Sequence, residues 1–183
     1  SLGHNFKPLV KAVSSQAKKQ IHVCNYFFSD IGVKYADELL SATGFEGVFF
    51  GNSGAEANEA AIKLARKFGQ LNGGSKRKTI VTLEHSFHGR TMATLTATGQ
   101  DIFHPETFAP YVEGFKTIKP NDYDSLKDAF DDTTAALMME CVQGEGGVFP
   151  LDKEWAKTAA EAARKAGAIV ICDEVQTGMG RTG

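Results

Sequence analysis

The chain lacks several features that would place it in a specialised class of protein. Its formal net charge is only -2 over 183 residues, so charge gives no reason to expect binding to nucleic acid or to an anionic membrane. No apolar run approaches the roughly 20 residues that span a bilayer, and residues 1–11 contain no signal-peptide core. The 42% hydrophobic and 23% charged residues are ordinary for a globular protein. We expect a soluble, cytoplasmic protein.

Cysteine is scarce. Cys24, Cys141 and Cys172 are an odd number of thiols without Cys-x-x-Cys spacing. This pattern argues against a disulfide framework and against a zinc site. We therefore expect three buried, reduced thiols and no bound metal.

The most informative stretch spans residues 48–68. Val48 to Phe50 is a short apolar run of the buried-strand kind, and residues 51–54 are typical of a turn. Ser53 and Glu56 have the spacing of a capping box, which predicts that Ser53 is the N-cap and that the helix begins at Gly54. Small and apolar residues at helical spacing predict the buried face of this helix: Ala57, Ala60, Ala61, Leu64, Ala65 and Phe68.

A strand that turns through small residues into a helix leaves free backbone N–H groups at the positive end of the helix dipole. Such a helix start is a site for an anion, most often phosphate. The alternative is a helix that is merely well capped. The absence of bulky side chains around Ser53 and Gly54 favours the phosphate only modestly.

Strands and helices alternate along the rest of the chain. The pattern predicts strands at 79–83, 135–141 and 168–172, and helices at 8–20, 31–42, 54 onward, 123–130 and 153–166. Residues 92–98 fit either state, and 100–121 are expected to be a long ordered loop or short irregular elements. The alternation indicates an α/β fold with a mostly parallel sheet flanked by helices. No linker or repeat interrupts it, so we expect a single partial domain over 1–183.

Four polar clusters fall where ligands collect in such a sheet, at or near the carboxyl ends of strands: 52–55, 85–90, 140–145 and 173–176. Asp173 directly follows a fully apolar strand, and a carboxylate there is costly without a cation or donor. A structural arginine or a capping role would satisfy it. A protonated ring nitrogen also would, and together with a phosphate site it suggests pyridoxal phosphate.

For three other residues of these clusters, the sequence allows either a structural role or a role in ligand binding. Phe87 is either a core residue or one flat face for a cofactor ring, with Val175 on the opposite side. Arg90 is either a surface cation or a clamp for a substrate carboxylate. Glu145, between glycines, is either solvated or paired with a cation until substrate arrives.

Four motifs together resemble the class III pyridoxal-phosphate-dependent aminotransferases: Asn52-Ser53-Gly54-Ala55-Glu56-Ala57-Asn58-Glu59, Phe87-His88-Gly89-Arg90-Thr91, Gln143-Gly144-Glu145-Gly146-Gly147 and Asp173 through Gly183. The resemblance covers essentially the whole chain. It implies the large domain of a fold-type I enzyme with pyridoxal 5'-phosphate as cofactor. The wording of the first motif is most similar to members that act on N-acetylornithine.

The resemblance also implies roles for individual residues. Gly54 and Ala55 would bind the phosphate through their backbone, Asp173 would pair with the ring nitrogen, and Gln176 would reach the phenolic oxygen. Phe87 and Val175 would enclose the ring. The full set of cofactor-binding candidates is Ser53, Gly54, Ala55, Phe87, His88, Asp173, Val175 and Gln176. The substrate-binding candidates are Arg90, Glu145, Tyr26 and Phe27, the last two in the segment Asn25-Tyr26-Phe27.

One departure from the family pattern is large. The family's Schiff-base lysine lies beyond the motif that ends at Gly183, and Lys153, Lys157 and Lys165 lie on a predicted helix in the wrong context to replace it. The resemblance thus implies a fragment of a homodimeric enzyme, without the catalytic lysine and inactive by itself.

The expected activity of the parent enzyme is transamination of N-acetylornithine with 2-oxoglutarate, in arginine biosynthesis. The alternatives are another ω-aminotransferase, acting on ornithine, succinylornithine, succinyldiaminopimelate or 4-aminobutyrate, and a non-catalytic protein that keeps the fold. A plain nucleotide-binding domain is disfavoured because no Gly-x-Gly-x-x-Gly follows any predicted strand.

Overall fold

A computed structural model describes residues 2–24 and 26–182. The described chain divides into two compact units, residues 1–49 and 50–183. The prediction of a single partial domain stays a prediction.

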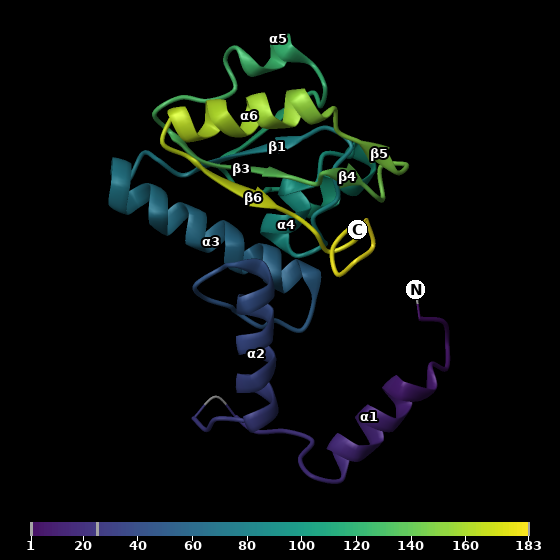
Figure 1. The fold of residues 1–183 in the computed structure, drawn as a ribbon. Coiled ribbons are helices and arrows are strands. Elements are labelled where there is room, and N and C mark those ends of the chain that lie inside the picture. Colours follow the sequence, from purple (N-terminus) through teal and green to yellow (C-terminus); the bar gives the residue numbers. More distant parts are fainter. Residues whose placement is uncertain (1, 25, 183) are drawn as a thin grey trace. The chain divides into compact units, whose positions relative to one another are not determined.

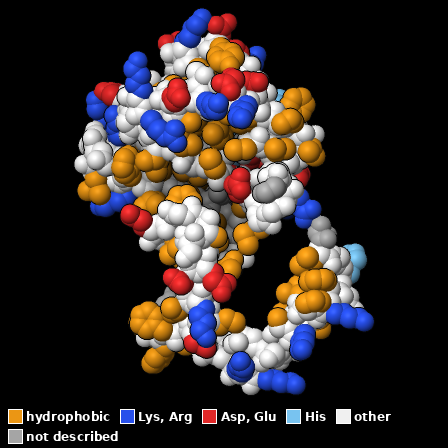
Figure 2. All heavy atoms as spheres, viewed as in Figure 1, with side chains coloured by type: hydrophobic (Ala, Val, Ile, Leu, Met, Phe, Trp, Pro, Cys, Tyr) orange, Lys and Arg blue, Asp and Glu red, His pale blue; other side chains and the backbone are white. Residues whose placement is uncertain are grey.

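The first unit contains two helices, α1 (Lys7–Ala17) and α2 (Asp30–Thr43). Both were predicted to within a few residues. Ser29 begins α2 by accepting a hydrogen bond from Gly32 N at 3.4 Å, and Gly44 ends it in the left-handed conformation with φ 73°. Neither helix contains a buried residue, and apolar side chains gather along one side of α1 (Figure 2).

The second unit is built around a four-stranded parallel sheet. Its strands are β1 (Thr79–Leu83), β2 (Phe115–Ile118), β3 (Thr134–Met139) and β6 (Ile169–Cys172), in the order β2-β1-β3-β6. The long helices α3 (Gly54–Gly73) and α6 (Lys153–Lys165) lie on opposite faces of this sheet (Figure 1). The predicted α/β class with a parallel sheet is confirmed.

The core has two parts because side chains alternate across a strand. Toward α6, Val81 and Leu137 pack around Trp155, which is fully buried. Toward α3, Ile80 and Met138 pack with helix residues that include Ile62 and Ala65. The two central strands β1 and β3 are almost wholly buried.

The remaining elements are short. Residues 92–98, whose sequence fits either a helix or a strand, contain the helix α4 (Met92–Ala97). The helix α5 (Tyr123–Leu126) is shorter than predicted. Residues 100–121 hold the 3-10 turns η1 (Asp101–Phe103) and η2 (Glu106–Phe108), and also β2, which was not predicted. A two-stranded antiparallel hairpin of β4 (Val142–Gln143) and β5 (Phe149–Pro150) follows β3.

Three predictions were wrong. Val48 to Phe50 is not a strand, and its side chains are exposed, because a short apolar run does not reveal whether a neighbouring strand exists to pair with it. Cys24, Cys141 and Cys172 are free thiols, but all three are exposed rather than buried. Cys172 ends an edge strand, where one flank of the sheet lacks a neighbour among the described residues.

The third error concerns which face of α3 is buried. The predicted stripe was Ala57, Ala60, Ala61, Leu64, Ala65 and Phe68. Ala65 is buried as predicted, but the other buried residues are Asn58, Ile62 and Gly69, and Leu64 is 67% exposed. A Cβ added to Gly69 would lie 2.3 Å from Arg77 O and 3.0 Å from Ala135 Cβ. At Gly69 the helix approaches its neighbours too closely for any side chain, so close packing as well as hydrophobicity decides which face is buried.

In the described part of the chain, no helix is long and apolar enough to cross a membrane. Within the same residues, no three His, Cys, Asp or Glu side chains lie close enough together to hold a metal ion.

Candidate active site

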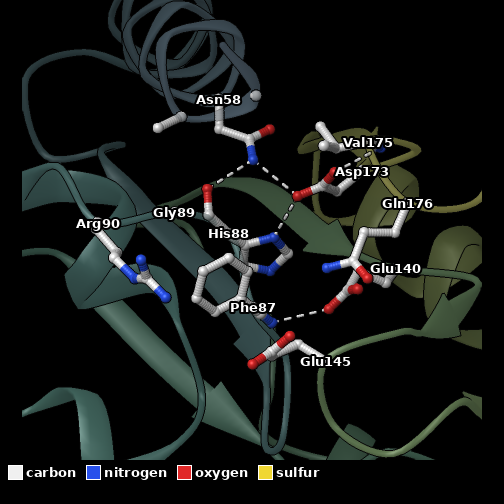
Figure 3. Close-up of a pocket in the computed structure, with 12 residues that line it drawn as sticks. Asn58, Phe87, His88, Gly89, Arg90, Glu140, Glu145, Asp173, Val175 and Gln176 are labelled. Atoms are coloured by element: carbon white, nitrogen blue, oxygen red, sulfur yellow. Dashed lines mark hydrogen bonds and ion pairs between the residues drawn. The ribbon is translucent and has the colours of Figure 1, made fainter. Parts of the chain in front are cut away.

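A pocket of about 390 Å³ opens in the second unit, where the N-terminus of α3 meets the loops that follow β1, β3 and β6. Figure 3 shows the side chains that converge there. The lining residues are Gly54, Ala55, Asn58, Phe87, His88, Gly89, Arg90, Glu140, Glu145, Asp173, Val175 and Gln176. All four predicted polar clusters therefore contribute to one pocket.

The start of α3 is held as a rigid anion site. Ser53 is the N-cap as predicted, and its Oγ accepts a hydrogen bond from Glu56 N at 3.2 Å. Glu56 reaches back to Asn52 N at 2.6 Å, one residue earlier than in a standard capping box. Gly54 N and Ala55 N, in the first turn, have no acceptor within the helix and are available to a ligand.

Two glycines let backbone segments approach each other closely at this helix start. A Cβ on Gly54 would lie 2.8 Å from both methyl groups of Val175. Gly89 has φ 132°, and a Cβ there would lie 2.8 Å from Ala55 Cβ. The loops after β1 and β6 can thus sit against α3 only because these positions carry no side chain.

Asp173 lies at the centre of a buried hydrogen-bond network (Figure 3). Its Oδ2 accepts hydrogen bonds from Asn58 Nδ2 and lies 2.7 Å from His88 Nδ1, and its Oδ1 accepts one from Val175 N at 3.0 Å. Asp173 and Asn58 are each 6% exposed and His88 is 2% exposed. Among the described residues no arginine bonds to this carboxylate, and Val175 N is only one of its three partners. Neither a structural arginine nor a capping role alone therefore accounts for it.

Burial is the largest influence on the pKa of Asp173 and acts to raise it. The hydrogen bond and charge of His88, with the donors Val175 N and Asn58, outweigh that effect, so the pKa lies below its usual range. Asp173 is therefore held as a carboxylate. Its Oδ1 carries one hydrogen bond and retains a lone pair for a further donor in the pocket.

Phe87 and Val175 supply apolar surfaces in the same pocket. Phe87 packs edge-on against Phe103 with ring centroids 5.3 Å apart, which fixes its ring. Val175 lines the pocket and is 60% exposed. A flat aromatic ligand with a phosphate and a protonated ring nitrogen matches these apolar surfaces, the N–H donors of α3 and the carboxylate acceptor of Asp173.

Arg90 and Glu145 come from separate loops and both lie beside Phe87 (Figure 3). The Arg90 guanidinium lies over the Phe87 ring, 5.8 Å from its centroid. Among the described residues, neither Arg90 nor Glu145 forms an ion pair. Both charges are therefore available to a charged ligand.

Glu140 is a buried residue of the site whose role was not predicted. Its carboxylate accepts hydrogen bonds from Phe87 N at 2.8 Å and from Gly144 N at 3.2 Å, and it thereby joins the loop after β1 to the β4–β5 hairpin. Burial raises the pKa of Glu140 against the effect of these two donors and of His88, and the charge of Asp173 raises it further. Because β3 ends at Met139, Glu140 is an acidic residue directly after an apolar strand, like Asp173, but the predicted strand 135–141 placed it inside the strand.

The other predicted site residues have different positions. Ser53 caps α3 but does not line the pocket. Gln176 lines the pocket with its side chain against Gly144, where an added Cβ would lie 2.4 Å from Gln176 Oε1. Tyr26 and Phe27 belong to the first unit and are exposed, so their role stays a prediction. Asn25 lies outside the described residues.

Comparison with known sequences decides the family. The profile described as Aminotransferase class-III matches residues 1–183. The chain belongs to the class-III aminotransferase family. It is 46% identical over 184 residues to the acetylornithine aminotransferase of Caldanaerobacter subterraneus subsp. tengcongensis, covering 100% of this chain and 46% of that protein. It is 42% identical over 182 residues to the acetylornithine aminotransferase of Clostridium acetobutylicum, covering 100% and 47%.

Solved structures agree with this aminotransferase assignment. The ornithine aminotransferase of Toxoplasma gondii ME49 matches 96% of this chain and 42% of its own, with a TM-score of 0.89 and 28% sequence identity. A second structure of the Toxoplasma gondii enzyme, with the same TM-score and identity, has partial occupancy of PLP at its active site. The present chain spans about half the length of the curated relatives it matches.

Proposed function

We propose that this aminotransferase transfers the amino group of N-acetylornithine to 2-oxoglutarate in arginine biosynthesis, with pyridoxal 5'-phosphate as cofactor. The observation that carries the proposal is the buried carboxylate of Asp173 in the same pocket as the free N–H groups that begin α3. The names of the curated relatives support the amino donor.

The pocket offers a place for each part of the cofactor. Gly54 N and Ala55 N would hold the phosphate, with Ser53 fixing the helix start. Asp173 would hold the ring nitrogen in its protonated form, and Gln176 would reach the phenolic oxygen. Held in this way, pyridoxal phosphate would supply an electron sink for the substrate carbon that loses its proton.

The remaining residues would orient the ring and the substrates. Phe87 and Val175 would enclose the ring from two sides, and His88 would keep Asp173 charged. Arg90 would bind a substrate carboxylate as a bidentate clamp. Glu145 would pair with a neighbouring cation, and that pairing would differ between the complex with the amino donor and the complex with 2-oxoglutarate. Tyr26 and Phe27 would contribute to the substrate pocket.

We also propose that the protein acts as a cytoplasmic homodimer and that residues 1–183 by themselves have no turnover. The pocket described here would bind the cofactor without a lysine placed to bond to it. Lys153 and Lys157 lie on α6, and neither lines this pocket.

A second candidate is an ω-aminotransferase with another donor, favoured by the structural likeness to an ornithine aminotransferase. Glutamate production from 2-oxoglutarate distinguishes the two when the protein at its full natural length is supplied with N-acetylornithine, ornithine, succinylornithine or 4-aminobutyrate. We expect the highest kcat/KM with N-acetylornithine and no turnover by residues 1–183 alone. A preference for free ornithine would overturn the donor, and no turnover with any amine would favour a non-catalytic protein.

A further inference from the structure

We propose that Asn58 is a positioning residue that ties the phosphate-binding start of α3 to the carboxylate of Asp173, and so selects a cofactor ring with a protonated nitrogen. The inference rests on the proposed function, because it concerns the same pocket. Asn58 has no role in the chemistry itself.

A single carboxamide makes both links. Asn58 Nδ2 donates one hydrogen to Asp173 Oδ2 at 2.7 Å and the other to His88 O at 2.8 Å (Figure 3). Because both partners are acceptors, only the amide nitrogen can face them, which fixes the orientation of the side chain. Both hydrogens are used, and the residue is 6% exposed, so water does not replace either partner easily.

The position of Asn58 on α3 explains what it connects. Asn58 lies four residues after Gly54, on the same face of the helix. Gly54 contacts Val175 closely, as the 2.8 Å approach of its hypothetical Cβ shows, and Asn58 contacts Asp173 one turn later. Two successive turns of α3 therefore fix the loop that carries Asp173 and Val175, the two residues on this loop that are proposed to contact the cofactor ring.

Asn58 also fixes the direction of the Asp173 carboxylate. With Asn58 and His88 both on Oδ2, the other oxygen, Oδ1, has only Val175 N as a partner among the described residues. The loss of Asn58 would leave Oδ2 held by His88 Nδ1 alone, which fixes the carboxylate less firmly, and would leave His88 O buried without this donor. The phosphate site on α3 does not use the carboxamide, so the effect is confined to the ring end of the cofactor.

The residue type agrees with this role. Asparagine is a poor helix former, and α3 places it on its buried face beside Ile62, Ala65 and Gly69. Alanine or leucine at this position would leave His88 O without this donor and Asp173 Oδ2 with only His88 Nδ1. Aspartate would bring a second carboxylate to Asp173.

Binding of two cofactor forms to the protein at its full natural length tests the inference. One probe is pyridoxal phosphate, and the other is its analogue with carbon in place of the ring nitrogen, which keeps the phosphate but offers nothing to Asp173. We expect Asn58→Ala to weaken pyridoxal phosphate about tenfold and the analogue less than about threefold. Asn72→Ala is the matched control, because Asn72 lies on the same helix, is exposed, and among the described residues its side chain bonds only to Phe68 O in its own helix. It should change neither affinity.

Equal weakening of both probes would overturn the inference, since it would show a purely structural role, and so would unchanged binding of pyridoxal phosphate. If Asn58→Ala does not fold by circular dichroism, Asn58→Ser, which adds no charge and offers one short O–H donor in place of two N–H donors, must show the same selective loss. Failure of the unsubstituted protein to bind either probe would instead overturn the proposed function on which the inference rests.

Discussion

His88 Nδ1 and Asp173 Oδ2 lie 2.7 Å apart, and both side chains are almost completely buried. The pair joins the loop after β1 to the loop after β6, 85 residues apart in the sequence. A carboxylate in such a place remains charged only because its donors are fixed around it.

Replacement of His88 should destabilise the fold strongly. In His88→Ala the buried carboxylate keeps Asn58 and Val175 N but loses its charge-assisted partner. We expect the free energy of unfolding in urea to fall by about 3 kcal/mol at pH 7. Lys157→Ala, which removes an exposed pair with Glu154, should cost less than about 1 kcal/mol. Similar losses in the two variants would contradict a special role for the buried pair.

Gly54 should not tolerate a side chain while Val175 is present. We expect Gly54→Ala to lower stability by about 1 kcal/mol and to weaken pyridoxal phosphate, because the added methyl would displace Val175. The double variant Gly54→Ala with Val175→Ala should recover most of the stability, since Val175→Ala removes the two colliding methyl groups. A double-mutant cycle by thermal unfolding measures this coupling, and strictly additive effects would argue against the close contact.

Arg90 should affect the oxo acid more than the cofactor. Lysine keeps the charge but not the bidentate geometry, so Arg90→Lys should raise KM for 2-oxoglutarate about tenfold with little change in the affinity for pyridoxal phosphate. Arg164→Lys on α6, outside the pocket, is the control and should leave both unchanged. If Arg90→Lys had the wild-type KM for 2-oxoglutarate, the proposal that Arg90 binds this substrate would be wrong.

Asp131 should contribute to stability in a pH-dependent way. The hydrogen bond from the Thr133 hydroxyl, followed by that from Thr133 N, holds the pKa of Asp131 below its usual value. A folded-state pKa below the unfolded value of about 3.9 means that the carboxylate stabilises the fold above that pH and that this contribution is lost as the pH falls through the folded pKa. Asp131→Ala should therefore be less stable than wild type at pH 6, by less than about 1 kcal/mol since Asp131 is exposed, and the two should converge at acid pH.

Urea unfolding at a series of pH values between 6 and 3 checks the prediction for Asp131. A difference between the two proteins that grows as the pH falls would have the wrong sign and would contradict this assignment.

Much of the fold could be predicted because local signals agreed with each other. Residues 79–83 are a strand with the predicted bounds, and Ser53 begins α3 where its spacing with Glu56 indicated. Asp173 and Phe87 line one pocket, as expected from the general rule that ligands collect at the carboxyl ends of the strands of a parallel sheet.

The error on α3 occurred where close packing, rather than hydrophobicity alone, decides which residues are buried. Leu64 lies on the exposed side of α3 while Asn58 and Gly69 are buried, because that face needs a hydrogen-bond donor and a residue without a side chain. For the same reason Asn58 was not predicted as a site residue. A buried amide can be recognised only when its acceptors, here on residues 88 and 173, are known to lie beside it.

The most direct test of the account is a titration of the protein at its full natural length with pyridoxal phosphate, followed by absorbance, for wild type and Asp173→Ala. The account predicts saturable binding by wild type and at least about a tenfold loss of affinity in Asp173→Ala, with both proteins folded by circular dichroism. Equal affinity in the two proteins, or no saturable binding by wild type, would contradict the claim that this pocket holds the cofactor through Asp173.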